Sequence, residues 1–285
     1  MTLVDTHAHL YWDSFKEGFD DVIKRAQDAG VNIIINVGVN VELSKKALEQ
    51  VRQFHGERSR TIEFYSTIGI HPHEAVKYLN DKLEKDITRL EDIYKSAPDK
   101  IVAVGECGLD YLDIDEKTKQ LQRQLFQSQI DLAKKLNLPL IVHCRDDRSK
   151  NSQNSECWDE VIEMTKDWNG IYHCYSGLPQ TTNYILQTTR SARGVRRANF
   201  LISFAGNITY PKNEYLRDAA KLIPSDRIVI ETDCPFLPPQ SKRGQRNEPA
   251  NVLEIAQIIA EIKGLSFEKI ANQTTMNVKR LLKLS

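Results

Sequence analysis

Short apolar runs rich in β-branched residues recur along the chain, and they constrain its fold more than any other feature. Several are apolar at consecutive positions, which is typical of parallel strands covered on both faces. The eight runs lie at residues 2–5, 31–38, 62–70, 101–104, 139–143, 170–174, 199–203 and 228–231. Stretches with helical periodicity lie between them, and the clearest, 119–137, carries one broad apolar stripe.

This alternation of strand and helix predicts an α/β fold. Further helical stretches occupy residues 41–54, 79–95, 155–167, 214–223, 251–263 and 267–283, the last two separated by Gly264. Strand–helix units that repeat about every 30 residues fit a (β/α)8 barrel of the TIM type with extra C-terminal helices. A doubly wound open sheet is the alternative, but it usually carries a glycine-rich phosphate loop after its first strand, and none is present. We therefore predict a single barrel domain over residues 1–285.

Composition limits the classes of protein that the chain can belong to. Hydrophobic residues make up 40% and charged residues 27%, which is typical of a globular chain and excludes a disordered one. Thirty-nine basic residues balance 39 acidic ones, so no overall field draws the protein to nucleic acid or to a membrane. Five cysteines without a C-x-x-C pair exclude a secreted disulfide framework and a zinc ribbon. We expect a cytoplasmic protein, or a nuclear one in a eukaryote, with no membrane span and no obligate protein partner.

Histidines and carboxylates stand at the ends of the predicted strands. His7 and His9 follow the first run at spacing i, i+2, which turns both side chains to one face of a strand. Four more such groups lie at or just after the ends of other runs: Glu106, His143, His173 and Asp233. In a barrel these strand ends meet at the mouth where active sites lie. Gathering such groups without a cation would be costly, so we predict that all six bind metal.

Six ligands suffice for two cations. Glu106 lies in the middle of the set and is best placed to be shared, which would hold the ions roughly 3.5–4 Å apart and generate a hydroxide nucleophile from water. We predict that Asp233 is both a ligand and the proton acceptor for that water. Glu231, two residues earlier, is predicted to orient a ligand histidine. Imidazole-rich sites favour zinc, manganese, iron or nickel over magnesium.

Several side chains near the predicted ligands bear on the substrate. His71 follows a strand and is predicted to contact substrate or to support a ligand. Arg145 shares a strand face with His143, and a guanidinium recognises phosphate through two hydrogen bonds. The alternative role of Arg145 is a salt bridge to Asp146 or Asp147. Arg243 and Arg246 lie in the segment after the last strand, where barrel loops often bind phosphate. The basic segment 190–197 is predicted to be a surface loop.

Four of the five cysteines directly follow a proposed ligand. They are Cys107, Cys144, Cys174 and Cys234. Alternation along a strand would turn them away from the mouth and toward the layer between barrel and helices, where they would be packing residues. A catalytic Cys–His dyad, with Cys144 or Cys174 as the nucleophile, is the alternative.

The strand-end motifs, in this order, resemble the TatD family of metal-dependent deoxyribonucleases among the amidohydrolase-like barrels. The matching segments are 5–9, 69–72, 105–110, 143–145, 173–177, 231–235 and 246–249. Cys107 and Cys234 depart from the apolar or small residues that are frequent in the family, and 190–197 is longer than usual. These departures leave the proposed ligands unchanged.

The resemblance implies specific ligand sets and a specific reaction. His7, His9, Glu106 and Asp233 would bind one ion, and Glu106, His143 and His173 the other. The reaction would be hydrolysis of DNA phosphodiesters, commonly by 3′→5′ exonuclease action, with Mg²⁺ or Mn²⁺, while Zn²⁺ stays open from the ligand chemistry. Roles in DNA repair and apoptotic DNA degradation are described for the family. We therefore expect DNA, single-stranded or at its 3′ ends, as the partner.

Two other functions use the same barrel. An amidohydrolase acting on C–N or ester bonds of a small molecule would need the same ligands, because a fold does not fix a substrate. A non-catalytic scaffold is the third hypothesis, but it would be expected to have lost a ligand, and all six are present.

Overall fold

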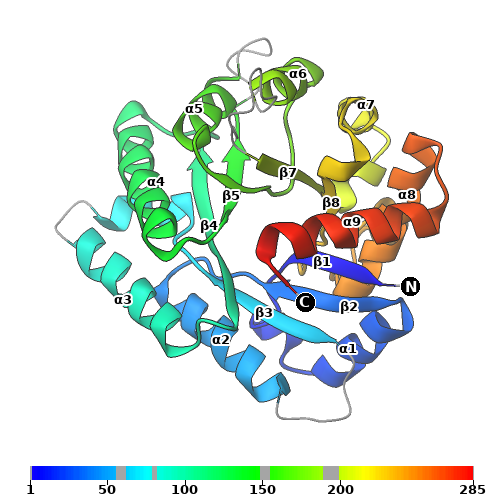
Figure 1. Cartoon of the computed structure of the whole chain (residues 1–285), viewed down its shortest axis with the longest axis horizontal. Helices are drawn as coiled ribbons and strands as arrows, with labels where there is room; N and C mark the ends of the chain where they lie inside the picture. Colours follow the sequence, from blue (N-terminus) through cyan, green and yellow to red (C-terminus); the bar gives the residue numbers. More distant parts are fainter. Residues whose placement is uncertain (1, 56–61, 79–81, 148–154, 189–198, 285) are drawn as a thin grey trace.

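All eight predicted strands form, and they pair in parallel in the order in which they occur in the chain (Figure 1). The computed structural model describes residues 2–55, 62–78, 82–147, 155–188 and 199–284. The strands are β1 (Leu3–Ala8), β2 (Val31–Asn36), β3 (Glu63–Ile68), β4 (Ile101–Asp110), β5 (Leu140–Arg145), β6 (Asn169–Tyr172), β7 (Asn199–Phe204) and β8 (Ile228–Ile230). A parallel bridge between Ala8 and Cys234 joins the two edges, which confirms the predicted barrel.

Helices surround the barrel (Figure 1). They are α1 (Phe19–Asp28), α2 (Val41–His55), α3 (Lys82–Ser96), α4 (Glu116–Leu136), α5 (Glu156–Thr165), α6 (Pro179–Thr188), α7 (Glu214–Leu222), α8 (Val252–Lys263) and α9 (Phe267–Leu282). The sequence analysis missed α1 and α6, and α6 buries two threonines and Ile185 rather than an apolar stripe. Gly264 ends α8 in the left-handed conformation, as its position between two helical stretches suggested.

Helix α9 closes one end of the barrel. The interior of the barrel is filled by aliphatic side chains such as Ile35, Ile141 and Leu201, and Val278 and Leu282 of α9 pack against this cluster. The amide of Asn277 donates to the carbonyl oxygens of Ser225 and Ile228, at the start of β8. Figure 1 shows α9 lying across the barrel. The amino-terminal end is thus covered, and the carboxyl ends of the strands are left for a site.

Strand β4 extends six residues beyond the predicted end at residue 104. Glu106 therefore lies inside a strand rather than after one. Glycines interrupt the apolar pattern here, and the structure shows why Gly108 is needed. Its φ is +134°, and a Cβ atom at this position would lie 2.0 Å from the carbonyl oxygen of His143. Gly108 pairs with His143 in the sheet, so its missing side chain lets β4 and β5 approach closely.

The cysteines adopt the arrangement that strand alternation predicts, with one exception. Cys107, Cys144 and Cys234 are buried in the apolar layer between strands and helices. Burial raises the pKa of the Cys144 thiol well above its usual range, which disfavours a thiolate nucleophile. Cys174 is only half-buried, and its backbone has a φ of 42°. All five cysteines are thiols.

Within the described ranges, no helix combines the length and the apolar character that a bilayer crossing requires.

Candidate metal centre

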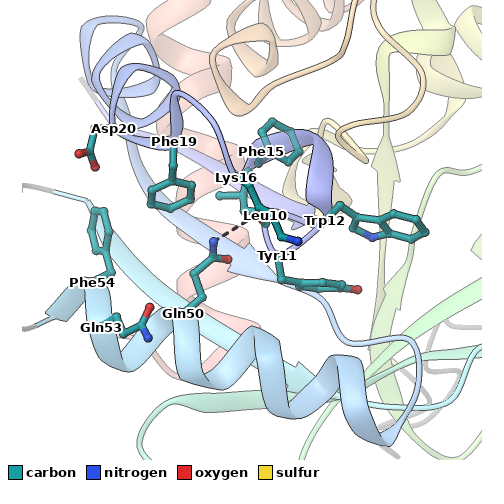
Figure 2. Close-up of a pocket in the computed structure, with 10 residues that line it drawn as sticks. All are labelled: Leu10, Tyr11, Trp12, Phe15, Lys16, Phe19, Asp20, Gln50, Gln53 and Phe54. Carbon is teal, nitrogen blue, oxygen red and sulfur yellow. Dashed lines mark hydrogen bonds between the residues drawn. The ribbon is translucent and has the colours of Figure 1, made fainter.

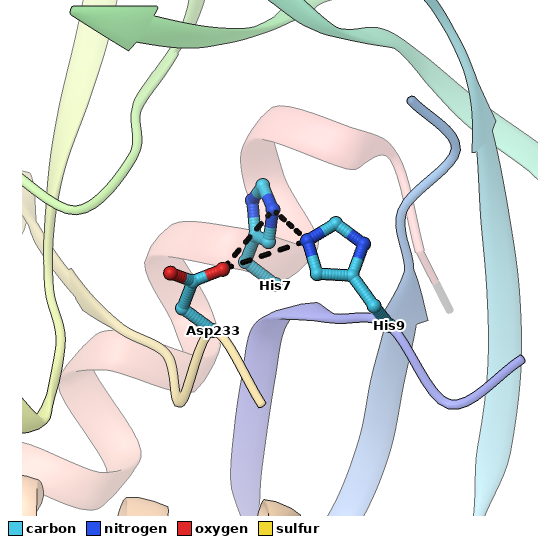
Figure 3. Close-up of side chains that lie close together, drawn as sticks. All are labelled: His7, His9 and Asp233. Atoms are coloured by element: carbon cyan, nitrogen blue, oxygen red, sulfur yellow. Dashed lines mark hydrogen bonds and ion pairs between the residues drawn. The ribbon is translucent and has the colours of Figure 1, made fainter. Parts of the chain in front are cut away.

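The predicted ligands converge at the carboxyl ends of the strands. The six are His7, His9, Glu106, His143, His173 and Asp233, and each lies within 4 Å of at least one other. Oδ1 of Asp233 is 3.5 Å from Nε2 of His9 and 3.8 Å from Nε2 of His7. Figure 3 shows these three side chains, from β1 and from the segment after β8, pointing toward one another. The closure of the barrel thus brings the first and last strand motifs together.

Glu106 lies between two groups of histidines. Its Oε2 atom faces His7 and His9, at 3.4 Å and 3.9 Å from their Nε2 atoms. Its Oε1 atom is 2.8 Å from Nε2 of His173 and 3.0 Å from Nδ1 of His143. The two oxygens of one buried carboxylate therefore serve two different imidazole groups. This is the arrangement that a carboxylate shared between two cations requires.

His71, predicted to contact substrate or to support a ligand, lies directly against this cluster. Its Nε2 atom is 3.3 Å from Oε1 of Glu106, so it stands among the predicted ligands rather than beyond them. Three sets of side chains have ligand atoms within 4.8 Å of one another. These sets are His7–His9–Asp233, His71–Glu106–His143 and His7–His173–Glu231. His71 thus has the geometry of a ligand as well as that of a substrate contact.

The donor atoms fit a divalent cation. Nδ1 of His7 and Oε2 of Glu231 are buried, and neither has a hydrogen-bond partner among the residues that the structure describes. Buried polar atoms are rarely left unpaired, so such atoms beside a cluster of imidazoles and carboxylates need an explanation. A set rich in imidazole nitrogen with a few carboxylate oxygens suits transition-metal ions of the first row.

The electrostatics of the cluster keep its carboxylates ionised. Burial raises the pKa of Glu106, but the neighbouring His173, His71 and His7 outweigh burial and hold this pKa well below its usual range. Burial also raises the pKa of Asp233, and its contact with His9 and the charges of His7 and His173 lower it by more. Burial, together with the nearby His173, lowers the pKa of His7 and favours its neutral form. Ionised carboxylates and neutral imidazoles are the forms that bind metal.

Two further carboxylates contact the ring nitrogens of His173 and His143 that do not face Glu106. Oε1 of Glu231 is 3.2 Å from Nδ1 of His173 and accepts a hydrogen bond of 2.7 Å from the backbone N–H of Cys174. Asp110, which the sequence analysis did not select, has its Oδ2 atom 3.2 Å from Nε2 of His143 and 2.8 Å from Nε2 of His73. Its spacing of four residues from Glu106 was the available signal, because residues i and i+4 share a strand face.

Asp5 is a second carboxylate that sequence reasoning passed over. Its Oδ1 atom accepts hydrogen bonds from the backbone N–H groups of Thr232 and His7, at 2.9 Å and 3.3 Å. Its Oδ2 atom accepts one of 2.5 Å from the hydroxyl of Thr232. Burial raises the pKa of Asp5 to about 7. Asp5 therefore ties β1 to the segment that carries Asp233 and fixes the two sides of the cluster relative to each other.

The predicted phosphate-binding arginines occupy different surroundings. Arg145 is exposed at the end of β5. The guanidinium of Arg243 lies 4.6 Å from the ring centroid of Tyr210. That of Arg246 lies 4.5 Å from the ring centroid of Phe15 and donates to the carbonyl of Ser14. Segment 190–197 falls outside the described residues.

A closed parallel barrel with imidazoles and carboxylates gathered at the carboxyl ends of its strands defines a metal-dependent hydrolase. The family model for the TatD related DNases matches residues 4–283. The chain belongs to this family.

Relatives of similar length share this assignment. The metal-dependent hydrolase YabD of Bacillus subtilis is 36% identical, over 99% of this chain and 100% of its own length. The 3′-5′ ssDNA/RNA exonuclease TatD of Shigella flexneri is 31% identical, over 98% of each chain. A solved TatD family hydrolase from Entamoeba histolytica has a TM-score of 0.82 at 25% identity, over 99% of this chain and 98% of its own. The predicted metal-dependent hydrolase is thereby confirmed at the level of the family.

Proposed function

We propose that this chain is a 3′→5′ exonuclease that hydrolyses phosphodiester bonds of single-stranded DNA with two divalent cations. The observation that carries the proposal is Glu106, whose two carboxylate oxygens face separate groups of histidines. The name of the Shigella flexneri relative supports the direction and the class of substrate, and RNA is included in that name. The two cations and the substrate range are the parts to be tested.

The donor atoms divide into two proposed sites. His7, His9, Asp233 and Oε2 of Glu106 would form one. His143, His173 and Oε1 of Glu106 would form the other, with His71 as a further donor. When bound, two divalent cations would activate a water and neutralise charge on the attacked phosphate.

The chain's own groups hold the cluster and move the proton. Asp233 is ionised and its side chain is 14% exposed, so it can reach both the cluster and the mouth. We assign to it the proton released from the attacking water. Glu231 and Asp110 would hold the imidazoles of His173 and His143 in their orientations. Arg145, exposed at the end of β5, would contact a phosphate of the substrate.

Mn²⁺ is the cation that satisfies both arguments about metal identity. The family resemblance favours Mg²⁺ or Mn²⁺, whereas the imidazole donors favour manganese or zinc over magnesium. Crystals soaked in Mn²⁺ would show the number and positions of ions in an anomalous-scattering map. Two peaks flanking Glu106 would support the proposal, and a single peak would contradict the paired arrangement.

One assay tests the reaction. The protein is treated with chelator, then supplied with Mg²⁺, Mn²⁺ or Zn²⁺ and given single-stranded DNA labelled at its 5′ or 3′ end. Metal-restored cleavage should shorten 5′-labelled strands progressively and release the 3′ label as mononucleotide. Intact DNA with every ion, together with turnover of an amide or a lactone, would favour the amidohydrolase alternative. That alternative is not favoured by the family assignment.

Two broader expectations also stay proposals. The first is that residues 1–285 act as one domain, which is supported by hydrogen bonds between β1 and the segment after β8. A single thermal transition would be expected. The second is a cytoplasmic location, which is supported by five cysteines that remain thiols. Cell fractionation tests it, and recovery in a secreted fraction would contradict it.

A further inference from the structure

Two large aromatic side chains stand exposed beside the histidine cluster. Trp12 is 40% exposed and Phe236 is 46% exposed. Their ring centroids are 5.6 Å apart, and the ring planes meet at 85°. Trp12 follows β1 and Phe236 follows β8, so the pair exists only because the barrel closes. Among the described residues, the other large aromatic side chain exposed to this degree is Tyr184 of α6.

The pair is continuous with the proposed metal centre. The ring centroid of Phe236 is 6.2 Å from that of His9. The backbone N–H of Phe236 donates to the carbonyl of Asp233, and that of Trp12 donates to the carbonyl of His9. The backbone of each aromatic residue is therefore fixed by a proposed ligand. A group bound against these rings would lie next to the reacting phosphate.

Trp12 is one of the residues that line a neighbouring pocket of about 260 Å³, together with residues that include Phe19, Gln50 and Phe54. Figure 2 shows the indole directed away from Phe19 and Phe54, with Phe15 and Tyr11 between. The amide of Gln50 donates to the carbonyl of Leu10 and accepts from the amide of Asn36. The exposed face of Trp12 is thus a surface that packing within the chain does not explain.

We propose that Trp12 and Phe236 form an aromatic platform on which one of the two bases flanking the scissile phosphodiester stacks. This inference rests on the proposed function. Stacking suits a nuclease without sequence preference, because every base presents a flat aromatic face. The net charge of zero gives the protein no overall attraction for a polyanion, so local contacts must supply binding. Because a paired base is held within its duplex, the platform also favours single strands.

Oligodeoxynucleotides that lack a base test the platform. Each carries one abasic residue, at the 3′-terminal or the penultimate position. With the wild-type protein, one of these substrates should raise KM about tenfold, the scale of one stacking contact. Trp12→Ala and Phe236→Ala should raise KM for normal DNA to a similar degree and leave kcat within a few fold. In these variants the abasic substrate should cause no further increase in KM, because the base and the platform contribute through the same contact.

A matched control separates the platform from general surface effects. Met276→Ala removes a side chain that is 63% exposed on α9, at the covered end of the barrel, and should leave KM unchanged. If the increases in KM caused by Trp12→Ala and by the abasic residue multiply, the inference is wrong. It is also wrong if Trp12→Ala has the KM of the wild-type protein. If the wild-type protein cleaves no DNA with any metal, the proposed function itself fails.

A binding measurement tests the platform without hydrolysis. The chain has three tryptophans, and Trp158 is buried while Trp168 is only partly exposed. Adding single-stranded DNA to Asp233→Asn protein in Mg²⁺ should quench the emission of Trp12. The quenching should vanish when Trp12→Phe is added to that variant, although this conservative change keeps a ring. Equal quenching with and without Trp12, or none in either protein, would overturn the platform.

Discussion

Glu231 lies behind His173: its Oε1 atom is 3.2 Å from Nδ1 of the imidazole, whereas Nε2 of the same ring is 2.8 Å from Glu106. The ring is thus held between two carboxylates and has its second nitrogen directed into the cluster. Burial lowers the pKa of His173, but the charges of Glu106 and Glu231 outweigh it and raise this pKa well above the usual range.

The exchange Glu231→Gln should reduce activity through His173. Glutamine can still accept the N–H of Cys174, but it lacks the charge that orients the imidazole. We expect metal affinity, measured by calorimetry, to fall about 10- to 100-fold. Glu268→Gln, an exposed position at the start of α9, is the control and should bind metal normally. An unchanged metal affinity in Glu231→Gln would show that Glu231 does not orient the imidazole of His173.

Asp233→Asn should abolish turnover and leave the fold intact. The carboxylate is the proposed proton acceptor, and an amide cannot take a proton from water, so kcat should fall at least about 100-fold. Circular dichroism and the melting temperature should stay close to those of the wild-type protein. Asp226→Asn, exposed at the opposite end of the barrel, should keep full activity. A near-normal rate in Asp233→Asn would refute the proposed acceptor.

Binding of metal should release protons. In the metal-free protein, burial lowers the pKa values of His9 and His143, but nearby carboxylates raise both above the usual value for histidine. These imidazoles therefore keep their protons to a higher pH than a free histidine does, and a cation must displace those protons. Metal affinity should rise with pH, and activity should fall below about pH 6.

Calorimetry of metal binding in buffers of different ionisation enthalpy measures this release directly. At pH 7 we expect net release of protons, which shrinks as the pH rises through the raised pKa values. An activity profile that stays flat down to pH 5 would count against histidine ligation.

Arg145→Gln should weaken binding of nucleic acid rather than catalysis. The guanidinium is exposed at the mouth, and losing one phosphate contact should raise KM several-fold and reduce the salt dependence of binding by about 0.7 in log–log slope. Arg280→Gln on α9 is an exposed arginine at the covered end and serves as the control. An unchanged slope in Arg145→Gln would show that this residue does not touch phosphate.

Gly108→Ala should destabilise the fold strongly. The residue has a φ of +134°, and an added methyl group would overlap the carbonyl oxygen of His143. We expect the free energy of unfolding in urea to fall by about 3 kcal/mol or more. Gly18→Ala is the matched control, because φ is +73° there but no atom lies within 4 Å. It should cost only about 1 kcal/mol.

The strands and the central ligands could be predicted because each corresponds to a local pattern in the sequence. A strand buried on both faces is apolar at every position, and His143 or Asp233 lies at or just after the end of such a run. Asp5 and Asp110 lie in the same motifs, but their roles depend on Thr232 and His143, which are far away in sequence. The pairing of Trp12 with Phe236 likewise appears only when the barrel closes. Helix α6 leaves no apolar stripe to detect.

The bridge that closes the barrel also orders events during translation. The hydrogen bond between Asp5 and Thr232 spans 227 positions of the chain, and His7 and Asp233 meet across the same seam. A ribosome must therefore polymerise more than four-fifths of the protein before the last of the six proposed ligands exists. An unfinished chain that ends before Asp233 cannot complete the cluster that the proposed reaction needs.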